Sequence, residues 1–113
     1  MKNILTIILA LFMLSLGTNA FAHPASEVII AVDGATVTVT VPHTVKDPTQ
    51  HYINKVELLL NDAEFVLLEP TSQTDNDQQV VTFTVPDLKS KDILTAKTVC
   101  NKGGDRTGIL EIA

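Results

Sequence analysis

The sequence predicts an all-β protein, and three observations support this prediction. Val37, Val39 and Val41 alternate with threonines, which is the period of a strand that has one apolar face. Tight-turn signals, among them Asp33-Gly34 and Asn61-Asp62, recur at short intervals. Beyond the first residues, no stretch shows the apolar period of a helix of useful length.

The predicted strands follow one another along the chain. The first two form a hairpin around Asp33-Gly34, and the third and fourth join at Asn61-Asp62. The polar residues 73–78 are predicted to form a loop, and Pro86 ends the fifth strand. The predicted strands cover residues 27–32, 36–41, 53–60, 64–68, 80–85, 92–99 and 107–112. Seven short strands with regularly spaced turns predict an immunoglobulin-like antiparallel β-sandwich.

The N-terminus predicts a cleaved secretory signal peptide over residues 1–22. Lys2 supplies a basic start, residues 4–16 form an apolar run, and Ala20-Phe21-Ala22 is a cleavage signal. The apolar run is too short to span a bilayer. We therefore expect a periplasmic or secreted protein, with one domain over residues 23–113 and no membrane association after cleavage.

The charge of the chain excludes some partners. Its formal net charge is −5, and cleavage would remove a basic residue and no acidic one. An acidic surface repels nucleic acid and strongly anionic membranes, so we expect neither as a partner. The sequence also shows no repeat, no glycine-rich phosphate loop and no local Ser/His/Asp signature.

Two of the three histidines lie in a single polar segment. His43 follows the second predicted strand, His51 precedes the third, and the turn-forming residues Lys46, Asp47 and Pro48 lie between them. The polar surroundings predict that neither histidine belongs to the core. Each alone fits an ordinary surface residue, but two imidazoles that flank a turn can converge on one metal ion.

The remaining candidate ligands are Cys100 and His23. Cys100 is the only cysteine, so it forms an intermolecular disulfide, is a buried inert thiol, or binds a metal. His23 would begin the mature chain, where its α-amine and imidazole can chelate a metal such as copper, or where it is simply a frayed terminus. A thiolate with imidazoles suits iron, zinc or copper.

These residues resemble the iron-binding domain of the superoxide reductases, the neelaredoxin and desulfoferrodoxin family. The resemblance lies in "VPHTVKDPTQHYI", in the following "NKVELLL", and in "VCN" near the C-terminus. It implies an immunoglobulin-like sandwich with one mononuclear non-haem iron, held by four histidines and an axial cysteinate and open to superoxide. It also implies that His43 and His51 are loop ligands, that Cys100 is the axial ligand, and that His23 is the early histidine.

The sequence departs from the family pattern at Gly103, where the Cys-Asn-x-His-Gly motif has its last histidine. The Glu-Lys pair before the first histidine and the four-cysteine iron domain of some members are also absent. The α-amine of His23 can replace the missing nitrogen. Lys46 and Lys102 are candidates for the cation that attracts superoxide, or else ordinary solvated lysines.

The resemblance therefore implies an exported superoxide reductase-like metalloprotein. It would reduce superoxide to hydrogen peroxide by one electron, which an electron donor that the sequence does not identify would supply. Two other hypotheses stay open: a periplasmic copper- or zinc-binding protein that kept the fold without turnover, and a metal-free β-sandwich interaction module.

Overall fold

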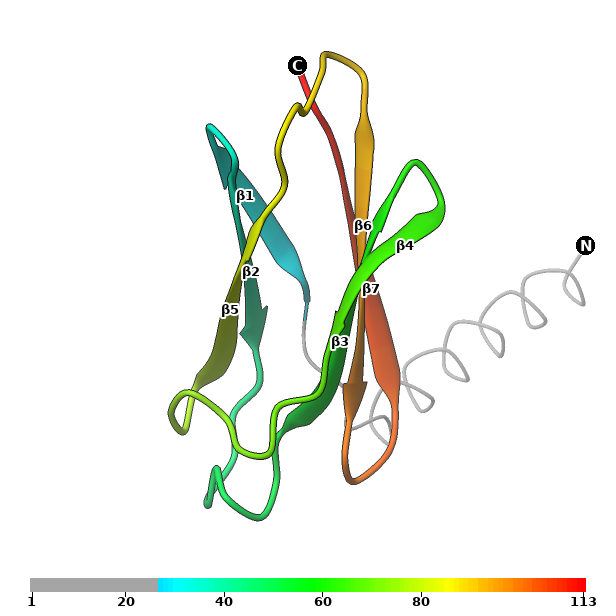
Figure 1. The fold of residues 1–113 in the computed structure, drawn as a ribbon. Coiled ribbons are helices and arrows are strands. Elements are labelled where there is room, and N and C mark those ends of the chain that lie inside the picture. Colours follow the sequence, from blue (N-terminus) through cyan, green and yellow to red (C-terminus); the bar gives the residue numbers. More distant parts are fainter. Residues whose placement is uncertain (1–26) are drawn as a thin grey trace, which may run out of the picture.

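A computed structural model of the protein describes residues 27–113. The predicted signal peptide and His23 lie outside the described residues. The described chain forms seven strands in two antiparallel sheets (Figure 1), which confirms the predicted all-β sandwich. The strands are β1 (Ile29–Asp33), β2 (Thr36–Pro42), β3 (Ile53–Leu60), β4 (Ala63–Leu68), β5 (Gln78–Thr84), β6 (Ile93–Cys100) and β7 (Asp105–Glu111).

The two sheets have an immunoglobulin-like strand order. One sheet has the order β1-β2-β5, and the other has the order β4-β3-β6-β7. The chain crosses between the layers after β2, after β4 and again after β5, so the strands of each sheet are not all consecutive. Figure 1 shows the two sheets facing one another, and buried side chains from both sheets form one hydrophobic cluster. Among the described residues, no helix is long and apolar enough to cross a membrane.

The alternating valines of β2 form one wall of the core. Val37, Val39 and Val41 are all 0% exposed, as the period of the sequence predicts. Across the gap, β3 and β6 contribute larger aliphatic side chains, including Leu58 and Leu94, which are also 0% exposed. The core thus extends along the strands and reaches Cys100, the last residue of β6, which belongs to the same buried cluster.

Two strands begin earlier than their residue types predict. β5 starts at Gln78, which pairs with Pro42, and β7 starts at Asp105, which pairs with Val99. Sheet pairing uses backbone groups, so a polar side chain does not prevent it when that side chain faces solvent. Pairing, rather than apolar content, therefore sets these two boundaries.

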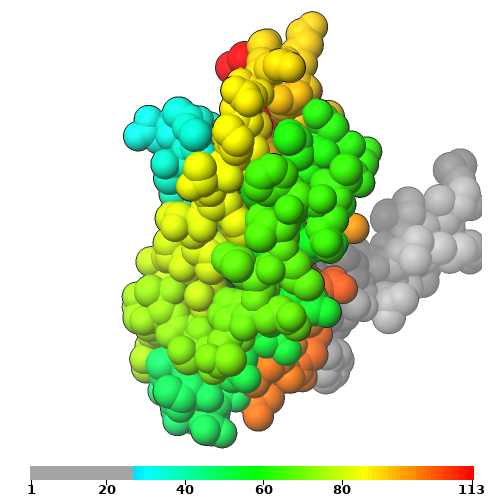
Figure 2. All heavy atoms as spheres, in the orientation of Figure 1, coloured from blue at the N-terminus to red at the C-terminus, as the bar shows by residue number. Residues whose placement is uncertain are grey.

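Three connections meet at one end of the sandwich, the lower end in Figures 1 and 2. They are the histidine loop (residues 43–52, between β2 and β3), the β4–β5 loop (residues 69–77) and the β6–β7 turn (residues 101–104). Backbone hydrogen bonds join them, including Val45 N to Asn76 O at 2.8 Å and Asn101 N to Tyr52 O at 3.0 Å. These bonds make the three connections one structural unit.

The chain that leads into β1 passes very close to β7. A Cβ atom at Gly108 would lie 2.5 Å from the backbone oxygen of Val28 and 2.8 Å from its Cβ. These distances are shorter than van der Waals contact, so only glycine fits at this position of β7.

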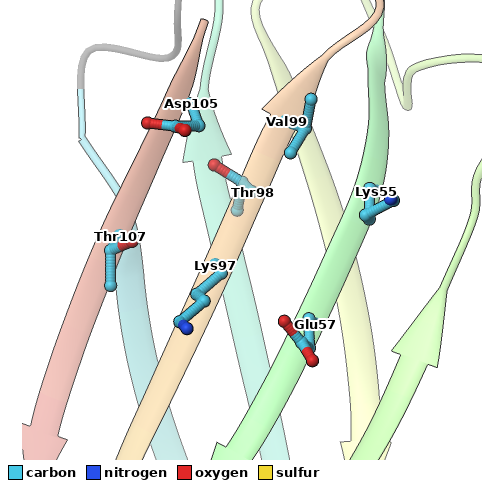
Figure 3. Close-up of a pocket in the computed structure, with 7 residues that line it drawn as sticks. All are labelled: Lys55, Glu57, Lys97, Thr98, Val99, Asp105 and Thr107. Atoms are coloured by element: carbon cyan, nitrogen blue, oxygen red, sulfur yellow. The ribbon is translucent and has the colours of Figure 1, made fainter.

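The outer face of the four-stranded sheet has a depression of about 350 Å³ (Figure 3). Opposite charges meet there, because Glu57 and Lys97 are partners in the β3–β6 register. The lining contains no histidine or cysteine: it consists of Lys55, Glu57, Lys97, Thr98, Val99, Asp105 and Thr107. This depression has the character of a solvated sheet face.

Candidate metal centre

Strand register brings His51 and Cys100 together. Ile53, the first residue of β3, pairs with Cys100, the last residue of β6. His51 lies two residues before Ile53, so its ring is carried to the same strand end. The distance between His51 Nε2 and Cys100 Sγ is 3.2 Å, which is within hydrogen-bonding range for sulfur.

His43 reaches the same point from the other sheet. β2 ends at Pro42, and the backbone N–H of His43 donates to Asp77 O at 2.8 Å, which continues the pairing with the segment before β5. The ring of His43 meets the ring of His51 edge to face, with centroids 4.8 Å apart and an interplanar angle of 86°. The three side chains therefore meet in the gap between the two sheets.

This group of side chains fits a metal ion. His43, His51 and Cys100 each offer a ligand atom, and these atoms lie within 4.8 Å of one another. His43 and Cys100 are buried and His51 is half-buried, so a bound ion would lie in a largely dry site with one partly open side. Two imidazoles and a thiol form a donor set for a transition metal.

The prediction that neither histidine belongs to the core is wrong for His43, which is only 4% exposed. The histidine loop is polar in sequence, but it folds back under the β4–β5 loop. Gln73 of that loop packs its side chain onto His43, and Gln73 is itself 5% exposed. This role has no signal in the sequence, because Gln73 lies in a polar stretch typical of an ordinary surface loop.

Asn101 holds the segment on both sides of His51. Its side-chain Oδ1 accepts from Tyr52 N at 2.9 Å, and its Nδ2 donates to Gln50 O at 3.0 Å. The residue directly after Cys100 thus fixes the residues directly before and after His51. Its signal in the sequence is its place after the cysteine in the "VCN" stretch.

The two lysines proposed as the cationic group lie at different parts of the site. Lys46 is exposed and lines, together with His51, a pocket of about 520 Å³ beside the histidine loop. The side chain of Lys102 is also exposed, while its backbone N–H approaches Cys100 Sγ at 3.4 Å. A role for either ammonium group remains a prediction.

Gly103, which stands where the family motif has a histidine, has a backbone conformation that favours glycine. Its φ is +119°, and a Cβ atom there would meet no heavy atom within 4 Å. A Cβ atom would therefore have space in this turn, but a residue other than glycine would adopt this φ only with strain. A histidine at position 103 would thus strain the β6–β7 turn.

His23 lies outside the described residues, but the described chain approaches β1 from the site end of the sandwich. Ile29 pairs with Thr40, two residues before the end of β2, and the described chain begins at Glu27. His23 lies four positions before Glu27, the first described residue. The assignment of His23 as a ligand stays a prediction.

Asp47 stabilises, by hydrogen bonds, the turn that precedes His51. Its carboxylate accepts from the Thr49 hydroxyl at 2.7 Å and from the Thr49 backbone N–H at 2.9 Å, and these two bonds lower its pKa below the usual value. Its backbone oxygen accepts from His51 N at 3.0 Å. The pKa of this carboxyl is therefore lower in the folded state than in the unfolded state, where it is about 4. Such a group stabilises the fold at pH values above its unfolded-state pKa. This stabilisation is lost as the pH falls through the folded-state pKa.

We therefore expect Asp47→Ala to lower the free energy of unfolding at neutral pH, and the difference from the wild type to shrink below about pH 4. Urea unfolding at a series of pH values measures this difference. Thr49→Val, which keeps the backbone donor and loses the hydroxyl, should show a smaller difference with the same pH dependence. A difference that stays constant from neutral to acid pH would contradict this account.

The protein is similar to known proteins in its fold. A scan against protein-family models finds no match, and a search of curated proteins finds no significant match. The structure is similar to a superoxide reductase (1Fe-SOR) from Giardia intestinalis, with a TM-score of 0.60 and 23% identity over 80% of this chain and 98% of that chain. It is also similar to a superoxide reductase (neelaredoxin) from Ignicoccus hospitalis, with a TM-score of 0.51 and 18% identity over 78% of this chain and 80% of that chain. The resemblance noted in the sequence is therefore confirmed in three dimensions: the described chain has the fold of the superoxide reductases.

Proposed function

We propose that the protein is an exported superoxide reductase-like metalloprotein. His43, His51 and Cys100 would hold one non-haem iron, with His23 as a further ligand, and superoxide would be reduced by one electron to hydrogen peroxide. The observation that carries the proposal is the meeting of two imidazoles and the only thiol at one end of a superoxide reductase fold. A periplasmic or extracellular location follows from the signal peptide predicted over residues 1–22.

The residues around the site suit this chemistry. A bound ferrous ion would supply the electron, two protons from solvent would complete hydrogen peroxide, and a separate electron donor would restore the ferrous state. Cys100 is 3% exposed, so its thiolate would donate charge from the dry side of the site. His51 is half-buried and lines the same pocket as Lys46. An anionic substrate that reached His51 through this pocket would pass the positively charged Lys46 side chain.

One observation favours zinc or copper instead of iron. Position 103 carries no imidazole, and the described residues bring together three ligands, two histidines and a cysteine, which is a common number for zinc. A chelate of the His23 α-amine and imidazole would favour copper in the order of metal affinities. In this alternative the protein binds metal without turnover.

The deciding experiment is to purify the protein from the periplasm of a bacterial host, expressed with its own N-terminal segment. Mass spectrometry would test cleavage after Ala22, and elemental analysis would give the metal content per chain. Superoxide would then be supplied to the protein together with a reductant, and hydrogen peroxide and dioxygen would be measured. Reduction yields one hydrogen peroxide per superoxide and no dioxygen, whereas dismutation yields half as much peroxide and releases dioxygen.

Iron near one per chain together with the reductive stoichiometry would support the proposal. Zinc or copper without superoxide consumption would favour the second candidate. In that case, one extra residue before His23 should weaken copper binding, because it moves the α-amine away from the imidazole chelate. A stable protein that binds none of these metals would leave the third hypothesis, an interaction module.

A further inference from the structure

We propose that Gln73 is a positioning residue of the metal centre, which fixes the Nδ1–H tautomer of His43 and so directs Nε2 to the metal. The inference rests on the metal site proposed above. The tautomer itself, however, is a property of the protein without metal. Gln73 reaches His43 from the β4–β5 loop, thirty positions along the chain, and both side chains are buried.

The hydrogen bonds of Gln73 fix the orientation of its amide group. Its Nε2 donates to the backbone oxygen of His43 at 2.7 Å and to the backbone oxygen of Asp75 at 2.9 Å. A flipped amide would place its oxygen against both carbonyl oxygens, which is unfavourable in a buried site. The nitrogen of the amide therefore faces the two carbonyl groups, and its oxygen faces the ring of His43.

This orientation determines the proton on His43. Gln73 Oε1 lies 2.8 Å from His43 Nδ1, and an amide oxygen only accepts hydrogen bonds. Nδ1 must therefore carry the proton and donate it. In a neutral imidazole with Nδ1 protonated, Nε2 holds the lone pair that binds a metal.

Gln73 also ties the loops around the site to one another. Its backbone N–H donates to Pro48 O at 2.9 Å, in the middle of the histidine loop. Together with the bond to His43 O, this joins the β4–β5 loop to the histidine loop at two points. One residue thus sets both the tautomer of a ligand and the position of its backbone.

The test uses the purified metal-free protein and two substitutions that separate these roles. Gln73→Met keeps the length of the side chain and removes every polar contact of the amide. Gln73→Glu keeps an acceptor for Nδ1–H but places a second oxygen against the two carbonyl oxygens, so it should keep the tautomer and lose stability. Long-range proton–nitrogen NMR of the imidazoles reports which nitrogen of His43 carries the proton.

We expect the Nδ1–H form of His43 in the wild type and in Gln73→Glu, and loss of this preference in Gln73→Met. Zinc affinity, measured by competition with a chromophoric chelator, should fall about 10- to 100-fold in Gln73→Met. Gln79→Met is the matched control, because Gln79 is also 5% exposed but lies in β5 opposite Val41. This control should keep both the tautomer and the zinc affinity.

Two results would overturn the inference: an Nε2–H tautomer in the wild type, or a Gln73→Met variant with unchanged tautomer and zinc affinity. A wild type that shows the Gln73-dependent tautomer but binds neither zinc nor iron would support the hydrogen-bonding role. It would also overturn the link to a metal and, with it, the proposed function. The NMR and metal readouts thus separate the failure of one proposal from the failure of the other.

Discussion

If Cys100 is a ligand of the proposed iron, the Cys100→Ser variant is expected to lose the thiolate-to-metal charge-transfer absorption and to bind metal much more weakly than the wild type. A metal binds the deprotonated thiolate of a cysteine, whereas a serine hydroxyl keeps its proton and is a much poorer ligand. Cys100 Sγ lies 3.2 Å from His51 Nε2, so the substitution removes a metal-binding atom directly beside a second candidate ligand. Visible spectra and zinc competition measure the two effects.

Cys100 belongs to the hydrophobic core as well, which calls for a second variant. Serine keeps a hydroxyl that can bond His51 Nε2 and Lys102 N as the thiol does, whereas Cys100→Ala removes the ligand and these hydrogen bonds together. Cys100→Ala should match Cys100→Ser in metal affinity, and the difference in metal-free stability between the two variants measures the hydrogen bonds. If both variants bind metal as tightly as the wild type, the assignment of Cys100 as a ligand is wrong.

The Gly108→Val variant is expected to lower the free energy of unfolding by about 1–3 kcal/mol, the usual cost of overfilling a packed site. The first atom of the new side chain would overlap the backbone oxygen of Val28, and backbone moves aside less easily than the end of a flexible side chain. The segment that leads into β1 would therefore be pushed away from β7. Chemical denaturation of the metal-free protein measures the loss.

The neighbouring Thr107→Val is the matched control, because Thr107 is exposed on the outer face of the same strand. Its stability should stay within about 0.5 kcal/mol of the wild type. If His23 is a ligand, Gly108→Val should also weaken metal binding, because it displaces the chain that carries His23, while Thr107→Val should not. A Gly108→Val protein as stable as the wild type would contradict the close contact with Val28.

The fold could be predicted from the sequence because its signals are local. The alternation through Val37, Val39 and Val41 and the turn at Asp33-Gly34 each involve residues that are neighbours along the chain. The pairs that define the site are not neighbours. The contact between His51 and Cys100 depends on the pairing of Ile53 with Cys100, and no local pattern fixes which residues of β3 and β6 face one another.

The supporting residues were harder still to predict. Gln73 contacts His43 only because the β4–β5 loop folds over the histidine loop, and loop packing depends on backbone geometry that a polar composition does not encode. The burial of His43 has the same cause. Asn101 had at least its position beside Cys100 as a signal, but its bonds to Gln50 and Tyr52 follow from the strand pairing.

The position of the site between the layers has a consequence for the lifetime of the folded protein. His43 follows a strand of one sheet, while His51 precedes and Cys100 ends strands of the other sheet. An ion held by all three would therefore be a removable cross-link between the two sheets. The chain has no second cysteine to make a permanent one. A ligand that binds only the folded state raises the free energy of unfolding with the logarithm of its free concentration. The resistance of the protein to proteolysis would therefore rise and fall with the concentration of free metal around it.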